Sequence, residues 1–190
     1  VVKAGNGTTY DQTITAVDTT EAIITTTGDL TFRGLSVEDD GGAGALKVSV
    51  GGNLAFDMDG GSGDINITSV AALSLGDITA ATNDTVLIQT TQLLTVAADI
   101  SAGGELTLRG ELGVDFDKDV TAESIEVKAG AGTAYGQAIT AIDTTDAILT
   151  TTAGALTLRG KSVMDDGGVT GIKVAVVNGN LILDVNEAAG

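Results

Sequence analysis

Residues 14–34 read ITAVDTTEAIITTTGDLTFRG, and residues 139–160 read ITAIDTTDAILTTTAGALTLRG. A weaker third copy, ITAATNDTVLIQTTQLLTV, occupies residues 78–96. A chain that resembles itself at a regular spacing is typical of one supersecondary unit stacked on copies of itself. These three stretches therefore predict a repeat architecture for the whole chain.

The repeat extends well beyond the quoted stretches. Val2–Thr27 and Val127–Thr152 match at most positions, at a constant offset of 125 residues. We expect one repetitive segment with three copies, at about residues 1–62, 63–125 and 126–190. A 125-residue repeat that is present about one and a half times also leads us to expect a slice of a longer array.

A short strand motif recurs inside each copy: Gly, then usually Asp or Asn, then apolar–x–apolar. It appears as GDLTF, GNLAF, GDINI, GDITA, GELTL, GALTL and GNLIL, starting at Gly28, Gly52, Gly63, Gly76, Gly104, Gly154 and Gly179. Apolar residues at alternate positions predict strands with one buried face. The Gly–Asx pair predicts a corner at which φ turns positive.

The fold class follows from these short strands and from the missing helical periodicity. We predict an all-β parallel β-helix (β-solenoid) built of coils of roughly 20 residues, with about nine coils in the chain. The alternative is a series of tandem Ig-like β-sandwiches. The chain has no Trp and no Pro, only 3% of its residues are aromatic, and the period is short, all of which favour the solenoid.

The composition narrows the classes of function. The formal net charge is −17, from 26 acidic and 9 basic residues. Nucleic acid and anionic lipid are poor partners for such a surface, because both are bound through Lys and Arg. The chain contains no His and no Cys, which removes the parts of a nucleophilic triad. We expect no enzymatic activity, no membrane span, and no cofactor other than Ca²⁺.

The repeated Gly–Asx–apolar–Thr–apolar coils, the Thr-rich strands and the scarcity of aromatic residues resemble the central repeats of filamentous-haemagglutinin-type adhesins and related giant bacterial surface proteins. The resemblance covers the whole chain and is one of composition. It implies a parallel β-helix with a structural or adhesive role outside the cell. The Asn–Pro–Asn–Gly type motif of that family's secretion domain is not present, so the resemblance implies a shaft segment.

Two groups of acidic residues are candidate Ca²⁺ ligands. Carboxylates at alternate positions followed by Gly supply the hard oxygen ligands of calcium loops. One group resembles a repeats-in-toxin nonapeptide, although its last Asp comes one residue early, and the other resembles the start of an EF-hand loop without its Gly. The alternative for both is an exposed acidic corner. The candidate ligands are Asp57, Asp59 and Asp64 in the first group and Asp115, Asp117 and Asp119 in the second.

Other polar residues recur at equivalent places in the copies. Arg33, Arg109 and Arg159 each precede Gly, and we expect them to pair with acidic residues one coil away. Asp39–Asp40 and Asp165–Asp166 are interpreted as turn residues. The glycosylation pattern Asn-x-Thr occurs at Asn6, Asn66 and Asn83.

Three functions remain compatible with these observations. The first is a structural or adhesive shaft of an extracellular filament or cell-surface adhesin, which assembles end to end with itself or with adjacent repeats and contacts a host or neighbouring cell. The second is a Ca²⁺-binding surface-layer or matrix module. The third, for which the sequence offers least, is a carboxylate-dependent, glycan-acting β-helix enzyme.

Overall fold

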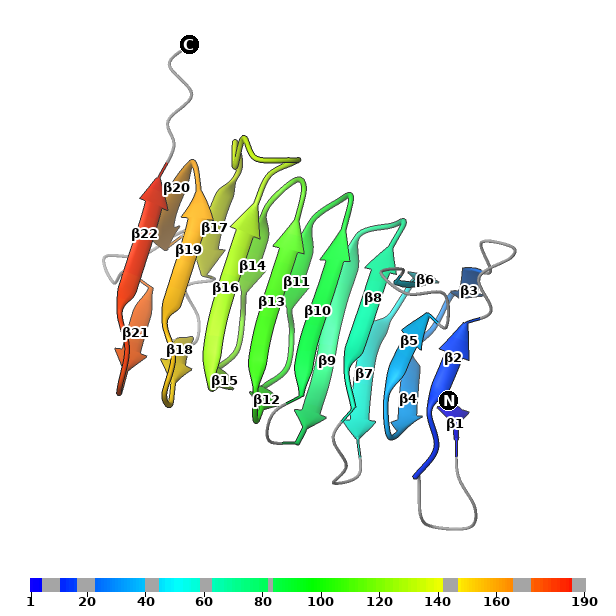
Figure 1. Ribbon diagram of the computed structural model, residues 1–190. Helices are drawn as coiled ribbons and strands as arrows, with labels where there is room; N and C mark the ends of the chain where they lie inside the picture. The colour runs from blue at the N-terminus through cyan, green and yellow to red at the C-terminus, as the bar shows by residue number, and fades with distance from the viewer. Residues whose placement is uncertain are drawn as a thin grey trace.

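The computed structural model describes residues 1–4, 11–16, 23–39, 45–58, 63–81, 84–141, 147–165 and 172–185. In these residues the chain forms a parallel β-solenoid of about six turns, with coils about 22 residues apart and no helix (Figure 1). The prediction of an all-β solenoid is confirmed, and the Ig-like sandwich is wrong because every described strand pair is parallel.

The described strands form two sheets. The twelve-stranded sheet contains β1 (Val2–Lys3), β4 (Leu30–Gly34), β7 (Asn53–Met58), β9 (Leu73–Ala80), β11 (Leu94–Val96), β12 (Ile100–Ala102), β14 (Val114–Phe116), β15 (Val120–Ala122), β17 (Ala138–Ala141), β18 (Ile148–Thr151), β20 (Ser162–Asp165) and β21 (Lys173–Val176). The ten-stranded sheet contains β2 (Ile14–Ala16), β3 (Ile23–Thr26), β5 (Val37–Asp39), β6 (Leu46–Val50), β8 (Ile65–Ser69), β10 (Thr85–Thr90), β13 (Glu105–Gly110), β16 (Ser124–Ala129), β19 (Leu156–Gly160) and β22 (Leu181–Val185).

The number of coils is smaller than the sequence predicted, because several coils are long. Leu106 pairs with Ile125 in the next coil, and Ile125 in turn pairs with Leu156. The second of these steps along the chain is much longer than the first, so a single fixed coil length overestimates the number of turns. The extra residues lie between the strands, and the pairing register inside each strand is therefore kept.

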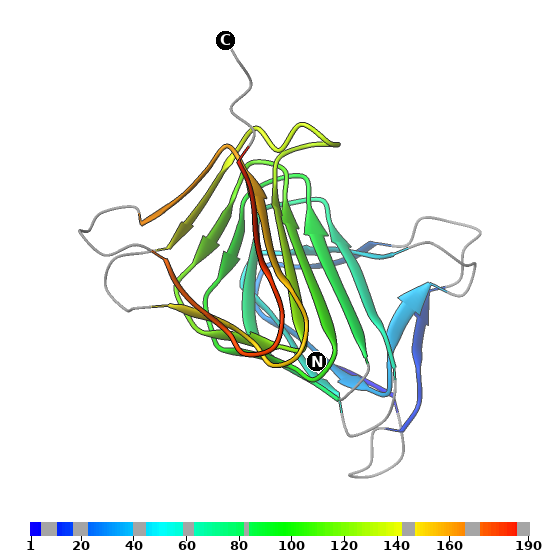
Figure 2. The same ribbon diagram turned by 60° about the vertical axis from the view of Figure 1, so that its left-hand side comes forward.

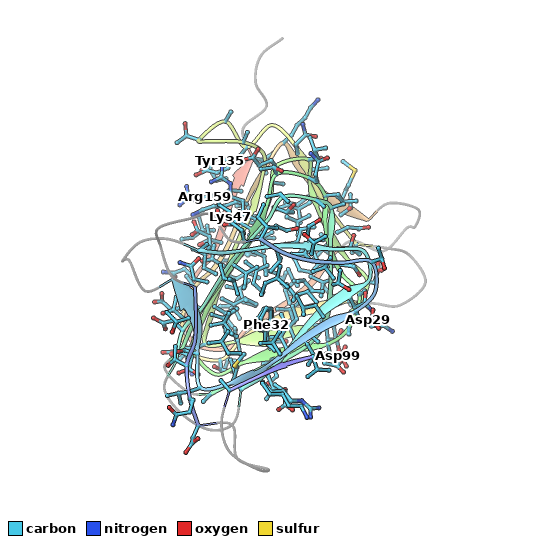
Figure 3. All side chains as sticks on the ribbon, turned by 90° about the vertical axis from the view of Figure 1, so that its right-hand side faces the viewer. Asp29, Phe32, Lys47, Asp99, Tyr135 and Arg159 are labelled. Atoms are coloured by element: carbon cyan, nitrogen blue, oxygen red, sulfur yellow. The ribbon has the colours of Figure 1, made fainter. Side chains whose placement is uncertain are left out.

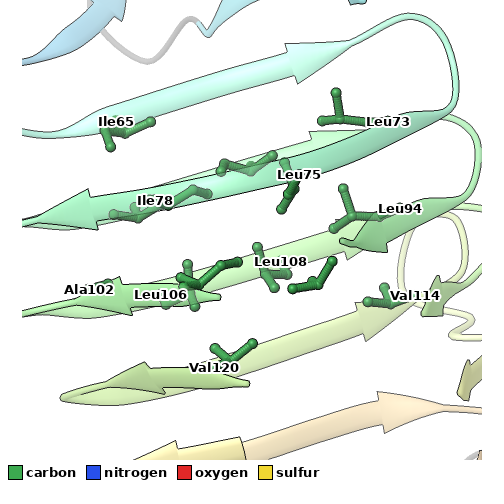
Figure 4. Close-up of a cluster of buried hydrophobic side chains, with 14 of the residues drawn as sticks. Ile65, Leu73, Leu75, Ile78, Leu94, Ala102, Leu106, Leu108, Val114 and Val120 are labelled. Carbon is green, nitrogen blue, oxygen red and sulfur yellow. The ribbon is translucent and has the colours of Figure 1, made fainter. Parts of the chain in front are cut away.

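The core is a set of stacked rows of aliphatic side chains between the sheets. Strands such as β4, β6 and β8 alternate buried and half-buried residues, as their apolar–x–apolar sequence predicts. Figure 2 shows the coils wound around a common interior, and Figure 4 shows apolar side chains of successive coils stacked on one another. Three phenylalanines are fully buried among these rows, and Phe32 stacks on Phe56 at 5.5 Å between ring centroids.

The two near-identical stretches of the repeat lie in opposite sheets. In the first copy, β2 and β3 belong to the ten-stranded sheet and β4 to the twelve-stranded sheet. In the second copy, β17 and β18 belong to the twelve-stranded sheet and β19 to the ten-stranded sheet. Nearly the same sequence therefore lies in the opposite sheet of the solenoid in the second copy.

The change of side takes place at β8 and β9. β8 pairs with two short strands, β5 and β6, in the preceding coil and with the single strand β10 in the following coil. β9 pairs with the single strand β7 on one side and with two short strands, β11 and β12, on the other. Before this coil, the ten-stranded sheet contains two short strands in each coil and the twelve-stranded sheet contains one strand; after this coil, the arrangement is reversed. The reversal is possible because single strands and paired short strands both bury alternate residues.

The glycines of the strand motif act differently from the prediction. Among the described residues, positive φ occurs at Gly113, Gly130, Gly132 and Tyr135, none of which belongs to a Gly–Asx pair. At the corner before β8, a Cβ on Gly63 would lie 2.7 Å from the carbonyl carbon of Leu35 in the preceding coil. Glycine is needed there because two backbones approach closely, so the positive-φ prediction is wrong.

Candidate functional site: corner carboxylates and face arginines

Five aspartates at the corners accept hydrogen bonds from backbone N–H groups, and we call them the corner carboxylates: Asp29, Asp64, Asp84, Asp99 and Asp119. Each stands directly before a strand. Successive strands are about 4.8 Å apart along the axis. A short carboxylate side chain spans this distance, so it binds an N–H group of the neighbouring coil that the strand ladder leaves open.

Two short series of these hydrogen bonds run along the stack. Asn53 donates its backbone N–H to Asp29 Oδ1 at 2.8 Å, and the hydroxyl of Ser74 in the next coil donates to Asn53 Oδ1 at 2.7 Å. Asp119 donates its N–H to Asp99 Oδ1 at 3.3 Å, and Ile148 donates to Asp119 Oδ1 at 2.9 Å. Figure 3 places Asp29 and Asp99 at the surface, while Phe32 lies in the interior.

Asp84 is the most enclosed of the corner carboxylates. Its side chain accepts a hydrogen bond from Gly63 N–H at 2.8 Å and another from Ala81 N–H at 3.0 Å, and the residue is 1% exposed. In the same corner, Thr85 N–H donates to Asp64 Oδ1 at 2.9 Å. Asp84 is not among the site residues expected from the sequence, although an Asp directly before the strand-forming residues 85–90 was the available signal.

The first group of predicted Ca²⁺ ligands is divided between the two sheets. Asp57 lies on β7, where its Oδ2 is 3.2 Å from Nε of Arg33. Asp64 precedes β8 of the other sheet and binds the backbone of the next coil. Asp59 lies outside the described residues. The structure thus gives Asp57 and Asp64 different protein partners.

The second group lies along one coil. Asp115 on β14 accepts a hydrogen bond from the hydroxyl of Thr140 at 2.7 Å, Asp117 follows β14, and Asp119 precedes β15. Asp119 stacks on Asp99, and Asp77 occupies the same place one coil before, because Ile78, Ile100 and Val120 pair in one row. In the part of the chain that the structure describes, no three acidic residues gather into a group that would hold a metal ion.

The arginines lie on the outer faces of the sheets. Arg33 pairs with Asp57 one coil away, and Arg159 lies 3.1 Å from Asp184 on one side and 3.1 Å from Glu126 on the other. These pairs agree with the predicted pairing between coils. All of them are partly exposed, so each stabilises the fold by at most about 1 kcal/mol.

Arg109 differs from the other two arginines. Its Nη2 is 4.0 Å from Glu111 of the same coil and donates to the carbonyl oxygens of Gly130 and Gly132 at 3.5 and 3.3 Å. Its partners one coil away are therefore carbonyls of the turn after β16 rather than carboxylates. Tyr135 of this turn has φ of 41° and lies under the Arg159 guanidinium, at 5.7 Å from the ring centroid.

The remaining polar candidates are only partly within the described residues. Asp39 ends β5 and Asp165 ends β20, while their neighbours at positions 40 and 166 lie outside the described part. Asn66 occupies a half-buried position on β8, and Asn6 and Asn83 lie outside the described part. The described residues contain no helix long and apolar enough to cross a membrane.

Comparisons with protein-family models, with curated proteins and with solved structures find no match for this chain. Its own sequence and structure show that the chain is a β-solenoid with repeat-like coils.

Proposed function

We propose that the chain is a structural or adhesive shaft of an extracellular filament or cell-surface adhesin, which assembles end to end. The observation that supports this proposal is the continuous stack of parallel coils, in which apolar rows run from one coil to the next and corner carboxylates bind the backbone of neighbouring coils. A repetitive stack of this kind is a quasi-one-dimensional spacer, because each coil contacts only its neighbours along the axis.

The charge of the chain fits an exposed shaft. A net charge of −17 on 190 residues keeps neighbouring rods apart and in solution. The corner carboxylates bind their own backbone, so part of this charge also stabilises the stack. The acidic side chains on the surface therefore repel neighbouring rods, whereas the aliphatic core holds successive coils of one rod together.

Immuno-electron microscopy of the producing cells tests the shaft. Antibodies against the purified chain are expected to label filaments or projections at the cell surface, at a distance from the membrane. Antibodies pre-absorbed with the chain serve as the control. Label confined to the cell interior would refute the surface shaft.

One observation favours a second candidate, a Ca²⁺-binding surface-layer or matrix module. Asp77, Asp99 and Asp119 stand in one exposed row, one coil apart, without gathering into a chelating group, and divalent cations attracted to this row would screen the repulsion between its charges. This candidate predicts that the melting temperature rises at millimolar Ca²⁺, that Mg²⁺ has a smaller effect, and that D99N/D119N loses the rise. An unchanged melting temperature in Ca²⁺ would remove this candidate.

A further inference from the structure

Exposed aliphatic side chains follow one corner of the solenoid through three successive coils in the middle of the stack, and we call them the apolar ridge: Val70, Leu93 and Leu112. Val70 lies in the turn from β8 to β9, Leu93 in the turn from β10 to β11, and Leu112 in the turn from β13 to β14. They are 45%, 40% and 54% exposed. Described coils lie before and after these three, so the ridge faces sideways, away from the axis of the stack.

The surface around the ridge carries little charge. Residues 65–76 form the first ridge turn with its flanking strands, residues 85–98 form the second, and neither stretch contains an acidic or basic residue. In the third coil Glu111 stands beside the ridge, with its Oε1 4.0 Å from Nη2 of Arg109 in the same chain. On a chain with a net charge of −17, a second copy can therefore approach this corner with little electrostatic repulsion.

We propose that the apolar ridge pairs two copies of the chain side by side in antiparallel orientation, around a two-fold axis that passes beside Leu93. Val70 belongs to the coil before Leu93, and Leu112 belongs to the coil after it. The axis therefore places Leu93 on Leu93 of the second copy, and Val70 on its Leu112. A two-fold contact needs a self-complementary surface, and the ridge is one because an apolar residue stands one coil away on each side of its centre.

The turn after β16 favours antiparallel over parallel pairing. Residues 130–137 make this turn longer than the turns of the ridge, and Figures 1 and 2 show it rising above the neighbouring coils. In a parallel pair the two long turns would meet at the same level and hold the ridges apart. In the antiparallel pair each long turn lies two coils from Leu93, opposite the turn at Gly51–Gly52 of the other copy, which has no side chains to obstruct it.

The small size of the ridge sets the strength of the contact. Three aliphatic side chains from each copy bury much less than the roughly 1,200 Å² of a stable interface, so we expect weak association between single chains. Shafts that present several ridges associate more strongly, because each further contact forms at a high effective concentration. Antiparallel shafts come from facing surfaces, so the contact joins two cells that display the chain. This consequence rests on the surface shaft proposed above, whereas the contact itself does not.

Sedimentation equilibrium of the untagged chain, at concentrations up to about millimolar, tests the contact. The wild type is expected to form dimers, and added NaCl is expected to strengthen them, because salt screens the repulsion between the acidic surfaces. L93S is expected to weaken the dimer about tenfold, since the substitution removes the side chain from both copies at the axis. M164S truncates a 46% exposed residue on β20, away from the ridge, and is expected to behave like the wild type.

Disulfide cross-linking tests the orientation, because the chain has no cysteine of its own. A mixture of V70C and L112C is expected to give the mixed dimer on oxidation, and L93C alone is expected to give dimers. K118C, at an exposed position between β14 and β15, is the control and is expected to stay monomeric. Circular dichroism checks that every variant keeps the strand content of the wild type.

The outcomes separate the contact, its orientation and the surface shaft. A wild type that stays monomeric over the whole concentration range, or L93S that associates as strongly as M164S, would overturn pairing through the apolar ridge. Dimers of V70C alone or of L112C alone that form faster than the mixed dimer would overturn the antiparallel orientation. Neither result bears on the surface shaft, which immuno-electron microscopy tests separately.

Discussion

The substitution D84A tests whether corner carboxylates stabilise the stack. Asp84 is 1% exposed, and its carboxylate accepts two backbone N–H groups, from Gly63 and Ala81, at 2.8 and 3.0 Å. Alanine leaves both donors without an acceptor in a part-buried corner. Each buried donor left unsatisfied costs about 1–3 kcal/mol, so we expect the free energy of unfolding to fall by about 2–4 kcal/mol.

Two further variants serve as controls for the loss of unfolding free energy expected in D84A. D29A removes an exposed carboxylate that accepts the N–H of Asn53, and it is expected to cost about 1 kcal/mol or less. D84N keeps one acceptor oxygen but turns an NH₂ group toward the second donor, so its loss is expected to lie between those of D29A and D84A.

Urea unfolding followed by circular dichroism measures the three losses, and native-state hydrogen exchange locates them. In D84A the amide protons of Gly63 and Ala81 are expected to exchange much faster than in the wild type, while those of the β16–β19 pair change little. A loss below about 0.5 kcal/mol for D84A, or equal losses for D84A and D29A, would refute the reasoning that burial makes this carboxylate the more important one.

Three further predictions concern the core, a corner glycine and a face ion pair. F56A removes a buried ring stacked on another phenylalanine and is expected to cost about 3–5 kcal/mol in urea unfolding. G63A forces a Cβ against the preceding coil and is expected to lower the melting temperature, whereas G28A, where a Cβ meets nothing within 4 Å, is expected to leave it nearly unchanged; equal shifts would contradict the close-approach argument. D57N removes the carboxylate partner of Arg33, both partly exposed, and a double-mutant cycle is expected to return less than about 1 kcal/mol.

Much of the fold was predictable because it depends on local alternation. The motif of Gly, then usually Asp or Asn, then apolar–x–apolar marks a strand start in six of its seven occurrences, as at Gly28 before β4 and Gly179 before β22. The exception is Gly76, which lies inside β9, opposite a register shift between Leu54 and Phe56 of β7. Alternation is a property of neighbouring residues, so the sequence alone reveals it.

The polar sites were only partly predictable. The pairing of Arg33 and of Arg159 with carboxylates one coil away was expected from the repeat, and the structure contains both pairs. Asp84 was missed, since its importance comes from burial and from a donor, Gly63, that belongs to the preceding coil. The Ca²⁺ ligands stay a prediction, and the structure adds that Asp57 and Asp64 belong to different sheets.

The repeat and the alternation of apolar residues are properties of the amino-acid sequence, so a stack of short parallel strands with an aliphatic interior could be predicted without coordinates. The number of coils, and the side of the solenoid on which each copy lies, could be read only from the folded chain. Coil length depends on the residues between strands, which carry no alternation, so the paired positions Leu106, Ile125 and Leu156 are unevenly spaced along the chain. The exchange of sheets at β8 and β9 then places Ile14 and Ile139 in opposite sheets, although their sequences are nearly the same.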